Sequence, residues 1–283
     1  MVMLVQPTPL EEAVRKLGAK TPVASALRSK DWAGMPLALR ERAQFSAGVE
    51  DARLMDLVQT KLMSAISLRR EQVANGAAYV DRSSFIGDFR KYVDALGLSD
   101  QTGGLTDLAT RARAALIYDT QIESAFGFAH WKRGTDPDVL NGTPAQELIA
   151  STARQPRIDW GERWSAACDE SGDDKAQAVY DETGRLVALK TSAVWTALNE
   201  DFGVPWPPFA FGSKRLLRDV FREEAEALGL LDPEDVLDPV QAQRLNDDLQ
   251  ADVTPGMAEI LDTIFGDQIQ VVDGKAMWRG AAA

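Results

Sequence analysis

Cysteine and histidine are nearly absent from this sequence, and each scarcity excludes a class of functional site. The 283 residues contain one cysteine, Cys168, and one histidine, His130. One cysteine cannot form an internal disulfide or a multi-cysteine zinc motif, a composition typical of the reducing cytoplasm. One histidine cannot build a metal site from several imidazoles. Acidic residues follow Cys168 and are expected to raise the pKa of its thiol, which argues against a catalytic Cys168–His130 pair.

The sequence also lacks the familiar signatures of nucleotide binding and hydrolysis. The patterns GxxxxGKS/T, GxGxxG, GxSxG and HExxH do not occur. Acidic residues outnumber basic ones, 43 to 31, and give a net charge of −12. This charge argues against duplex-DNA binding through a broad basic surface. Because no apolar run is long enough to span a bilayer and no basic leader opens the chain, we expect neither membrane insertion nor export.

The patterns that are present favour helices in the first half of the chain. Thr8 to Glu11 has the pattern of a capping box, and Gly18 ends the short helix that follows. Apolar residues then recur at helical spacing, with glycines that interrupt or end each run. We expect helices over residues 9–18, with Pro9 at the first helical position, 37–76 with a break near Gly48, 83–96 with a cap at Ser83 or Ser84 and a stop at Gly97, and 106–133.

The second half has shorter elements, more proline and two hairpin signals. Apolar alternation surrounds a turn at Gly184 in residues 178–190 and another at Asp273–Gly274 in residues 269–278. A helix is expected from Ser213 to Gly229, with five residues on its apolar face: Leu216, Leu217, Val220, Phe221 and Leu228. Two more helices are expected after Asp238–Pro239 and Thr254–Pro255.

Together these patterns predict an α+β fold that is predominantly helical. A helical N-terminal lobe is expected over residues 1–135, ending in a long helix that leads into the second domain. A smaller mixed domain with two β-hairpins, a proline and aromatic loop and C-terminal helices is expected over residues 136–283.

The segment FGVPWPPFAFGSKR, residues 202–215, concentrates aromatic rings where neither a helix nor a hydrogen-bonded strand is expected, because its prolines remove backbone donors. Two interpretations fit this composition. Either Trp206, Phe209 and Phe211 pin the loop to its own domain, or they form a docking surface. Because large aromatic side chains are usually buried, we favour a brace that seats the helix after Ser213, with some rings left for a partner.

Several charged clusters are candidates for binding. Asp119 and Glu123 lie four residues apart on one helical face, a spacing that suits a divalent cation or a shared proton, although a solvated face is the commoner role. The run DESGDD, residues 169–174, lacks the glutamate of a calcium loop and is expected to be an acidic loop. Arginines such as Arg40 and Arg42 are expected on solvated helix faces, and a local contact with nucleic acid is an alternative for them.

Four stretches, taken in order, resemble one known family: RERAQFSAGV (40–49), LIYDTQIESAFGFAHWKRGTDPDVL (116–140), PAQELI (144–149) and VWTALNEDFGVPWPPFAFGSKRLLRDVFREEAEALGL (194–230). They resemble bacteriophage minor head proteins of the Mu F-like head morphogenesis family. The segment from Trp206 to Phe209 stands for that family's aromatic-proline loop. Many members also carry a cysteine and histidine arrangement near the mixed domain, which this sequence lacks, so the resemblance implies no metal site here.

The resemblance implies a structural, low-copy virion protein that binds the portal protein, the major capsid protein or both, and aids head assembly, DNA packaging or DNA delivery. It implies a location in the host cytoplasm during assembly and then in the virion head, with no membrane, no cofactor and no enzymatic activity. Local contact with phage DNA would be secondary. The residues expected to contact the partner are Trp206, Phe209, Phe211, Lys214, Arg215, Arg40 and Arg42.

Two alternatives stay open at this point. One is a toxin-like or nucleic-acid-processing enzyme that uses Asp119, Glu123 and His130. The other is a transient assembly chaperone that is absent from the mature virion.

Overall fold

The computed structural model describes residues 11–33, 35, 37–67, 81–99, 101–150, 158–213, 215–238 and 250–278. Helices predominate and the strands form small sheets, which confirms the predicted α+β, predominantly helical fold. The chain divides into two compact units, Met1–Phe126 with Asn246–Ala283, and Gly127–Leu245, and each is described by itself. This division differs from the predicted one, because the C-terminal residues join the N-terminal unit.

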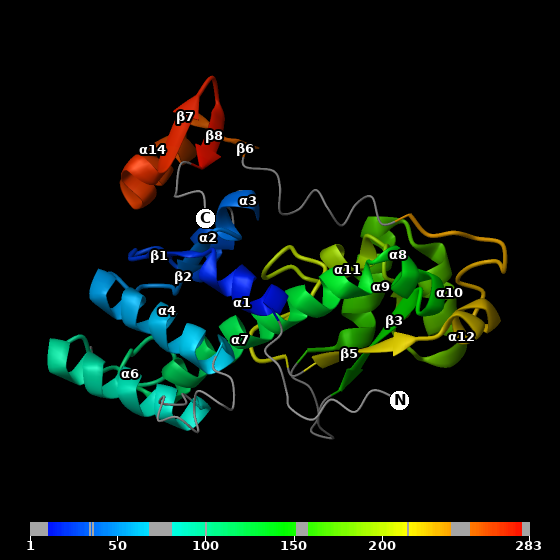
Figure 1. Ribbon diagram of the computed structural model, residues 1–283, viewed down its shortest axis with the longest axis horizontal. Coiled ribbons are helices and arrows are strands. Elements are labelled where there is room, and N and C mark those ends of the chain that lie inside the picture. Colours follow the sequence, from blue (N-terminus) through cyan, green and yellow to red (C-terminus); the bar gives the residue numbers. More distant parts are fainter. Residues whose placement is uncertain are drawn as a thin grey trace. The chain divides into compact units, whose positions relative to one another are not determined.

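The first unit is mainly helical (Figure 1). Its helices are α1 (Glu11–Gly18), α2 (Ser29–Ala33), α3 (Leu37–Arg40), α4 (Ala52–Ser67), α6 (Arg82–Leu96), the first part of α7 (Arg111–Gly134), α14 (Pro255–Phe265) and the 3-10 helix η1 (Gly266–Gln268). Its strands are β1 (Thr21–Val23), β2 (Ala43–Phe45), β6 (Gln250–Asp252), β7 (Ile269–Val272) and β8 (Lys275–Trp278). β1 and β2 pair in parallel, whereas β6, β8 and β7 form an antiparallel sheet in that order.

The C-terminal segment completes a hydrophobic core that begins near the N-terminus. Leu261 and Phe265 of α14 lie in one buried cluster with Val23 of β1 and Leu39 of α3. More than 200 residues of chain separate the two halves of this core. Packing over such a distance is the physical reason why residues 246–283 belong to the first unit and not to a C-terminal domain.

Local signals account for most helices of this unit. Asp81 begins α6 by accepting a hydrogen bond from the Ser84 backbone N–H, and Gly97 ends it with a φ of 66°. The stop at Gly97 is confirmed, whereas the cap is Asp81 and not Ser83 or Ser84. The predicted helix over residues 106–133 is confirmed as α7, which begins at Arg111.

The predicted C-terminal elements are also confirmed. α14 begins at Pro255, directly after Thr254. Asp273 and Gly274 both have positive φ, 53° and 74°, as a two-residue hairpin turn requires, and they join β7 to β8.

The predicted long helix over residues 37–76 is wrong in its first part. α3 ends at Arg40, β2 follows, and a turn at Gly48 with a φ of 68° precedes α4. Residues 43–45 form the strand β2 and not a helix, because their backbone pairs with β1 in the register Thr21↔Ala43. Residues 68–80 and the predicted capping box at Thr8 lie outside the described residues.

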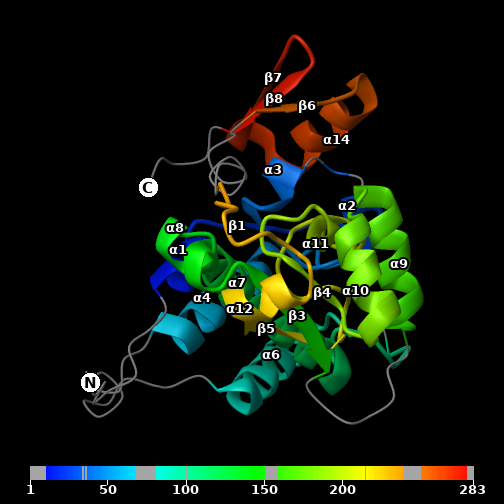
Figure 2. The same cartoon turned by 90° about the vertical axis from the view of Figure 1, so that its right-hand side faces the viewer.

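The second unit, Gly127–Leu245, contains a three-stranded antiparallel sheet in the order β4-β3-β5. Its elements are the last part of α7, α8 (Pro137–Gly142), β3 (Ala145–Ala150), α9 (Trp160–Ser171), α10 (Asp174–Thr183), β4 (Val187–Leu189), α11 (Val194–Ala197), β5 (Arg215–Val220) and α12 (Arg222–Ala227). Figure 2 shows α9 and α10 side by side, next to the sheet.

The predicted hairpin over residues 178–190 is wrong. Residues 174–183 form α10, because Asp173 accepts a hydrogen bond from the Ala176 N–H and Gly184 ends the helix with a φ of 70°. Gly184 is therefore a helix stop and not a hairpin turn, and β4 pairs with β3 instead. The same signals correct the predicted acidic loop at 169–174, which consists of the end of α9, Gly172 and the start of α10.

The predicted helix from Ser213 to Gly229 is wrong in its first half. Residues 215–220 form β5, which pairs with β3 from Ala145↔Val220 to Ala150↔Arg215. This ladder of six residue pairs overrides the local helical pattern. Only α12 is helical, and the helix predicted after Asp238–Pro239 lies outside the described residues.

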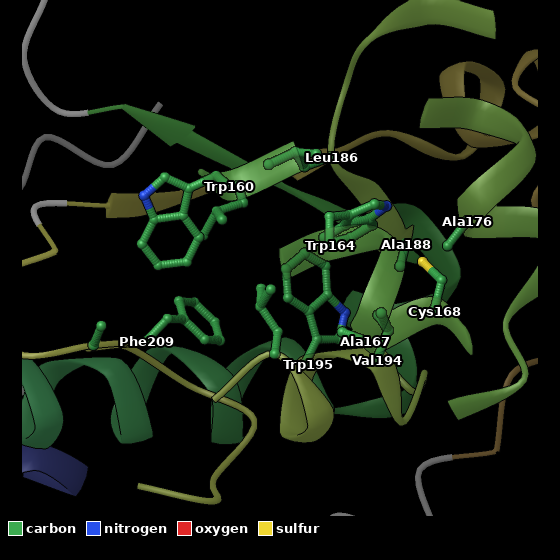
Figure 3. Packing of buried hydrophobic residues seen from close by; sticks show 13 residues of the cluster. Trp160, Trp164, Ala167, Cys168, Ala176, Leu186, Ala188, Val194, Trp195 and Phe209 are labelled. Carbon is green, nitrogen blue, oxygen red and sulfur yellow. The ribbon is translucent and has the colours of Figure 1, made fainter. Parts of the chain in front are cut away.

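A tryptophan-rich core lies next to this sheet (Figure 3). The rings of Trp164 and Trp195 meet edge to face with centroids 5.4 Å apart, and Trp195 lies 5.9 Å from Phe209. Cys168 is buried in the same cluster. Aromatic pairs in these geometries stabilise a core beyond the area that they bury.

The loop of residues 202–212 is a brace, as predicted. The Trp206 ring lies 5.2 Å from that of Phe128 and 4.9 Å from that of Trp131, and both partners belong to α7. The side-chain amide of Asn199 donates to the carbonyl oxygens of Val204 and Trp206, at 2.8 and 3.0 Å. The loop is thereby fastened to α7, and not to the helix that was predicted after Ser213.

Candidate interaction surface

β5 and its two flanks expose large apolar side chains. Leu216 is 52% exposed, Phe221 64% and Phe211 45%. The predicted helix would have buried Leu216 and Phe221. In the strand, Leu217 and Val220 lie on opposite faces of the sheet and pack into two different hydrophobic clusters, whereas Leu216 stays exposed. Exposed apolar side chains that gather in one region of a folded protein mark interaction sites. β5 is therefore the candidate interaction surface.

Arg215, the first residue of β5, lies over the ring of Trp160 with its guanidinium carbon 5.1 Å from the ring centroid. Burial lowers the pKa of Arg215, because the protein removes part of the water around the guanidinium. Among the described residues, no carboxylate forms an ion pair with it. Arg215 thus combines a partly dehydrated positive charge with a position at the edge of the sheet.

A network of four charged side chains lies on the opposite face of β5 from Arg215. The Glu147 carboxylate accepts from the guanidinium groups of Arg185 and Arg218, and Glu224 accepts from the same two arginines. Hydrogen bonds from Arg185, opposed by burial and aided by Arg218, hold the pKa of Glu147 below 4.5. The network joins β3, β5, α12 and the segment between α10 and β4, so it fixes the register of the candidate surface.

The substitution Glu147→Gln is expected to lower the free energy of unfolding at pH 7 by about 1 kcal/mol. The folded-state pKa of Glu147 lies below the unfolded value of 4.5, so its contribution is present above that pH and is lost as the pH falls through the folded-state pKa. Urea unfolding should therefore separate variant from wild type at pH 7 and bring them together near pH 3.

The control for this measurement is Glu182→Gln, a change at an exposed glutamate of α10. We expect it to leave the free energy of unfolding within about 0.5 kcal/mol of wild type at both pH values. If the free energy of unfolding of E147Q is as far below wild type at pH 3 as at pH 7, the ionic explanation is contradicted.

The residues predicted to contact a partner divide into two groups in this unit. Trp206 and Phe209 are fully buried, so the prediction that they form a contact surface is wrong. Phe211 is exposed, and its ring lies 4.8 Å from that of Phe202. Arg215 lies at the candidate surface, whereas Lys214 is outside the described residues.

Arg40 and Arg42 flank Glu41 in the first unit and are both half-buried, and Arg40 lies in an ionic cluster around Glu41 rather than on an open helix face. The Lys16 ammonium donates to the Glu41 carboxylate. Burial raises the pKa of Glu41, but Lys16, Lys20 and Arg40 together bring it below its ordinary value. Burial also lowers the pKa of Lys20 to about 8. These contacts give Arg40 a role within its own unit.

Two residues of the enzymatic alternative, Asp119 and His130, lie on α7. The Asp119 carboxylate accepts two hydrogen bonds from Arg82, at 2.6 and 2.8 Å. His130 is exposed on the same helix, in the second unit. Burial, followed by Asp173 and other acidic neighbours, raises the pKa of Cys168 to about 12, as the sequence predicted in direction.

The sequence did not reveal the Glu147 network or the exposure of Leu216 and Phe221. Glu147 and Arg218 lie 71 residues apart, and only the register of β3 with β5 brings them together. Residues 215–220, RLLRDV, do not alternate between polar and apolar side chains, so no local pattern indicated a strand there.

Comparisons with known proteins give no relative for this chain: no family model, curated protein or solved structure matches it. Across the described ranges, no helix is both long and apolar enough to cross a bilayer. Within the same ranges, His, Cys, Asp and Glu side chains form no group of three suited to a metal ion.

Proposed function

We propose that the chain is a structural minor head protein of a tailed phage or prophage, which binds the portal protein or the major capsid protein through the β5 surface. The observation that carries the proposal is the set of apolar side chains around β5, with Leu216 and Phe221 more than half exposed. A side chain of this size gains about 1.5–3 kcal/mol when a partner removes it from water.

The resemblance of residues 194–230 to the Mu F-like head morphogenesis family supports the same proposal, because β5 and its flanks lie within that stretch. The net charge of −12 keeps the free chain soluble before assembly and leaves apolar contacts to hold the complex. The protein would act in the host cytoplasm during assembly and in the virion head afterwards.

Mass spectrometry of purified virions tests this function. We expect peptides of the chain at a few copies per particle, together with binding of the purified protein to procapsids assembled in a host that lacks its gene. Detection in procapsids alone would identify an assembly chaperone that leaves the particle. Absence from both, with no binding to the procapsids, would contradict the proposal.

A further inference from the structure

One edge of β5 is open in the described part of the chain. β5 pairs with β3 through six residues, and β3 pairs with β4 on its other side, so β5 ends the sheet. Within the described ranges, no backbone hydrogen bond joins residues 215–220 to any strand except β3. The outer edge of β5 therefore presents a row of N–H and C=O groups that another strand could use.

The side chains along this edge restrict the residue types that such a strand would contain. Leu216 is exposed opposite Ile149 of β3, and Phe221 is exposed just beyond the end of β5. On the other face of the strand, Arg215 lies against Trp160 with no carboxylate partner among the described residues. A guanidinium that is partly removed from water and held against a ring is well placed to bind a carboxylate.

We propose that the edge of β5 binds an extended segment of the partner protein as an added strand. A carboxylate of that segment would bind Arg215, and apolar side chains would cover Leu216 and Phe221. The inference rests on the proposed function and specifies its binding mode. Main-chain hydrogen bonds to the edge would provide affinity, and the side-chain contacts would provide specificity.

The alternation of a strand makes the partner's sequence predictable. Neighbouring residues of β5 point to opposite faces of the sheet. The partner residues that contact Arg215 and Leu216 must therefore also point to opposite faces. An acidic residue opposite Arg215 therefore has its immediate neighbour opposite Leu216. We expect the partner segment to contain an acidic residue next to a large apolar one, and to lack proline in the residues that pair with β5.

The test uses the full-length chain and procapsids assembled without it as the probe. Arg215→Glu is expected to weaken binding roughly 30-fold, because it replaces an ion pair by a repulsion. Leu216→Lys is expected to weaken binding roughly 10-fold, since a charge on an edge strand opposes strand addition. Arg215→Lys keeps the charge and should lose less than Arg215→Glu.

Two matched controls come from the first unit. Leu105 is 53% exposed, almost the same as Leu216, so Leu105→Lys tests the loss of an exposed leucine elsewhere. Arg111, exposed at the start of α7, gives the control Arg111→Glu. Both should bind procapsids within about 2-fold of wild type. Thermal unfolding of all five variants verifies that they are folded.

Amide hydrogen exchange provides a second measurement. In the free protein, the outward amides of residues 215–220 should exchange faster than those paired with β3, and procapsid binding should slow them. Outward amides already protected in the free chain would overturn the inference, because the edge would be occupied. If the Arg215→Glu and Leu216→Lys variants bind procapsids as tightly as the wild type, the inference is overturned but the proposed function is not. Failure of the wild type to bind would overturn both.

Discussion

Replacing Trp206 with alanine is expected to lower the free energy of unfolding by about 3–5 kcal/mol. The side chain is fully buried and packs against Phe128 and Trp131 of α7. Truncation would remove this contact area and leave a cavity, which the proline-containing loop cannot close by moving freely. Urea unfolding followed by circular dichroism measures the effect.

Phe211→Ala in the same loop is the matched control. Its ring is 45% exposed and contacts Phe202, so the expected loss is below about 1 kcal/mol. Equal losses in W206A and F211A would contradict the role of Trp206 as the anchor of the brace. A large loss of unfolding free energy in W206A alone would confirm that Trp206 stabilises its own unit.

Gly127→Ala is expected to destabilise the protein by about 2 kcal/mol, although alanine favours a helix over glycine by about 1 kcal/mol. A Cβ at this position of α7 would lie 2.6 Å from the Pro207 carbonyl oxygen and 3.1 Å from its Cδ. These atoms belong to the backbone and ring of the brace, so no flexible side chain can move aside. The steric cost therefore exceeds the gain in helix propensity.

Gly87→Ala is expected to change the free energy of unfolding in the opposite direction. Gly87 lies inside α6, and a Cβ there would meet no atom within 4 Å. We expect this substitution to stabilise the protein by up to about 1 kcal/mol. The two glycine substitutions should thus have opposite signs in parallel urea unfolding experiments. Stabilisation by both would show that the loop does not approach α7 as closely as the structure indicates.

The elements that the sequence predicted well have both ends marked by nearby residues. α6 is bounded by Asp81 and Gly97, and the C-terminal hairpin turns at Asp273–Gly274. In each case the deciding hydrogen bond or positive φ involves residues fewer than five positions apart. Such signals act before tertiary structure forms, so they can be read from the chain alone.

Gly184 has the same positive φ as a hairpin glycine, but it ends α10. A glycine with positive φ serves equally as a hairpin turn and as a helix stop. The preceding Asp173 cap and the buried residues Ala176 and Val179, spaced three apart, distinguish the two. The alternating pattern of residues 178–190 was weaker than this pair of helix signals.

The candidate surface was predictable only in part. The stretch around residues 202–215 was expected to be ordered and rich in buried aromatics, and Trp206 and Phe209 are buried. Arg215 was among the residues expected to contact a partner. Leu216 and Phe221 were expected on a buried helical face, because five apolar residues in this stretch fit a helical spacing.

The sequence by itself determined the α+β composition, the capped helices and the C-terminal hairpin, since these depend on propensities and on hydrogen bonds between near neighbours. Tertiary structure decided that residues 215–220 are a strand, because pairing with β3, about 70 residues earlier, satisfies six residues of backbone at once. It also decided that the C-terminal helix completes an N-terminal core. Contacts between distant segments depend on register and burial, which local patterns do not encode.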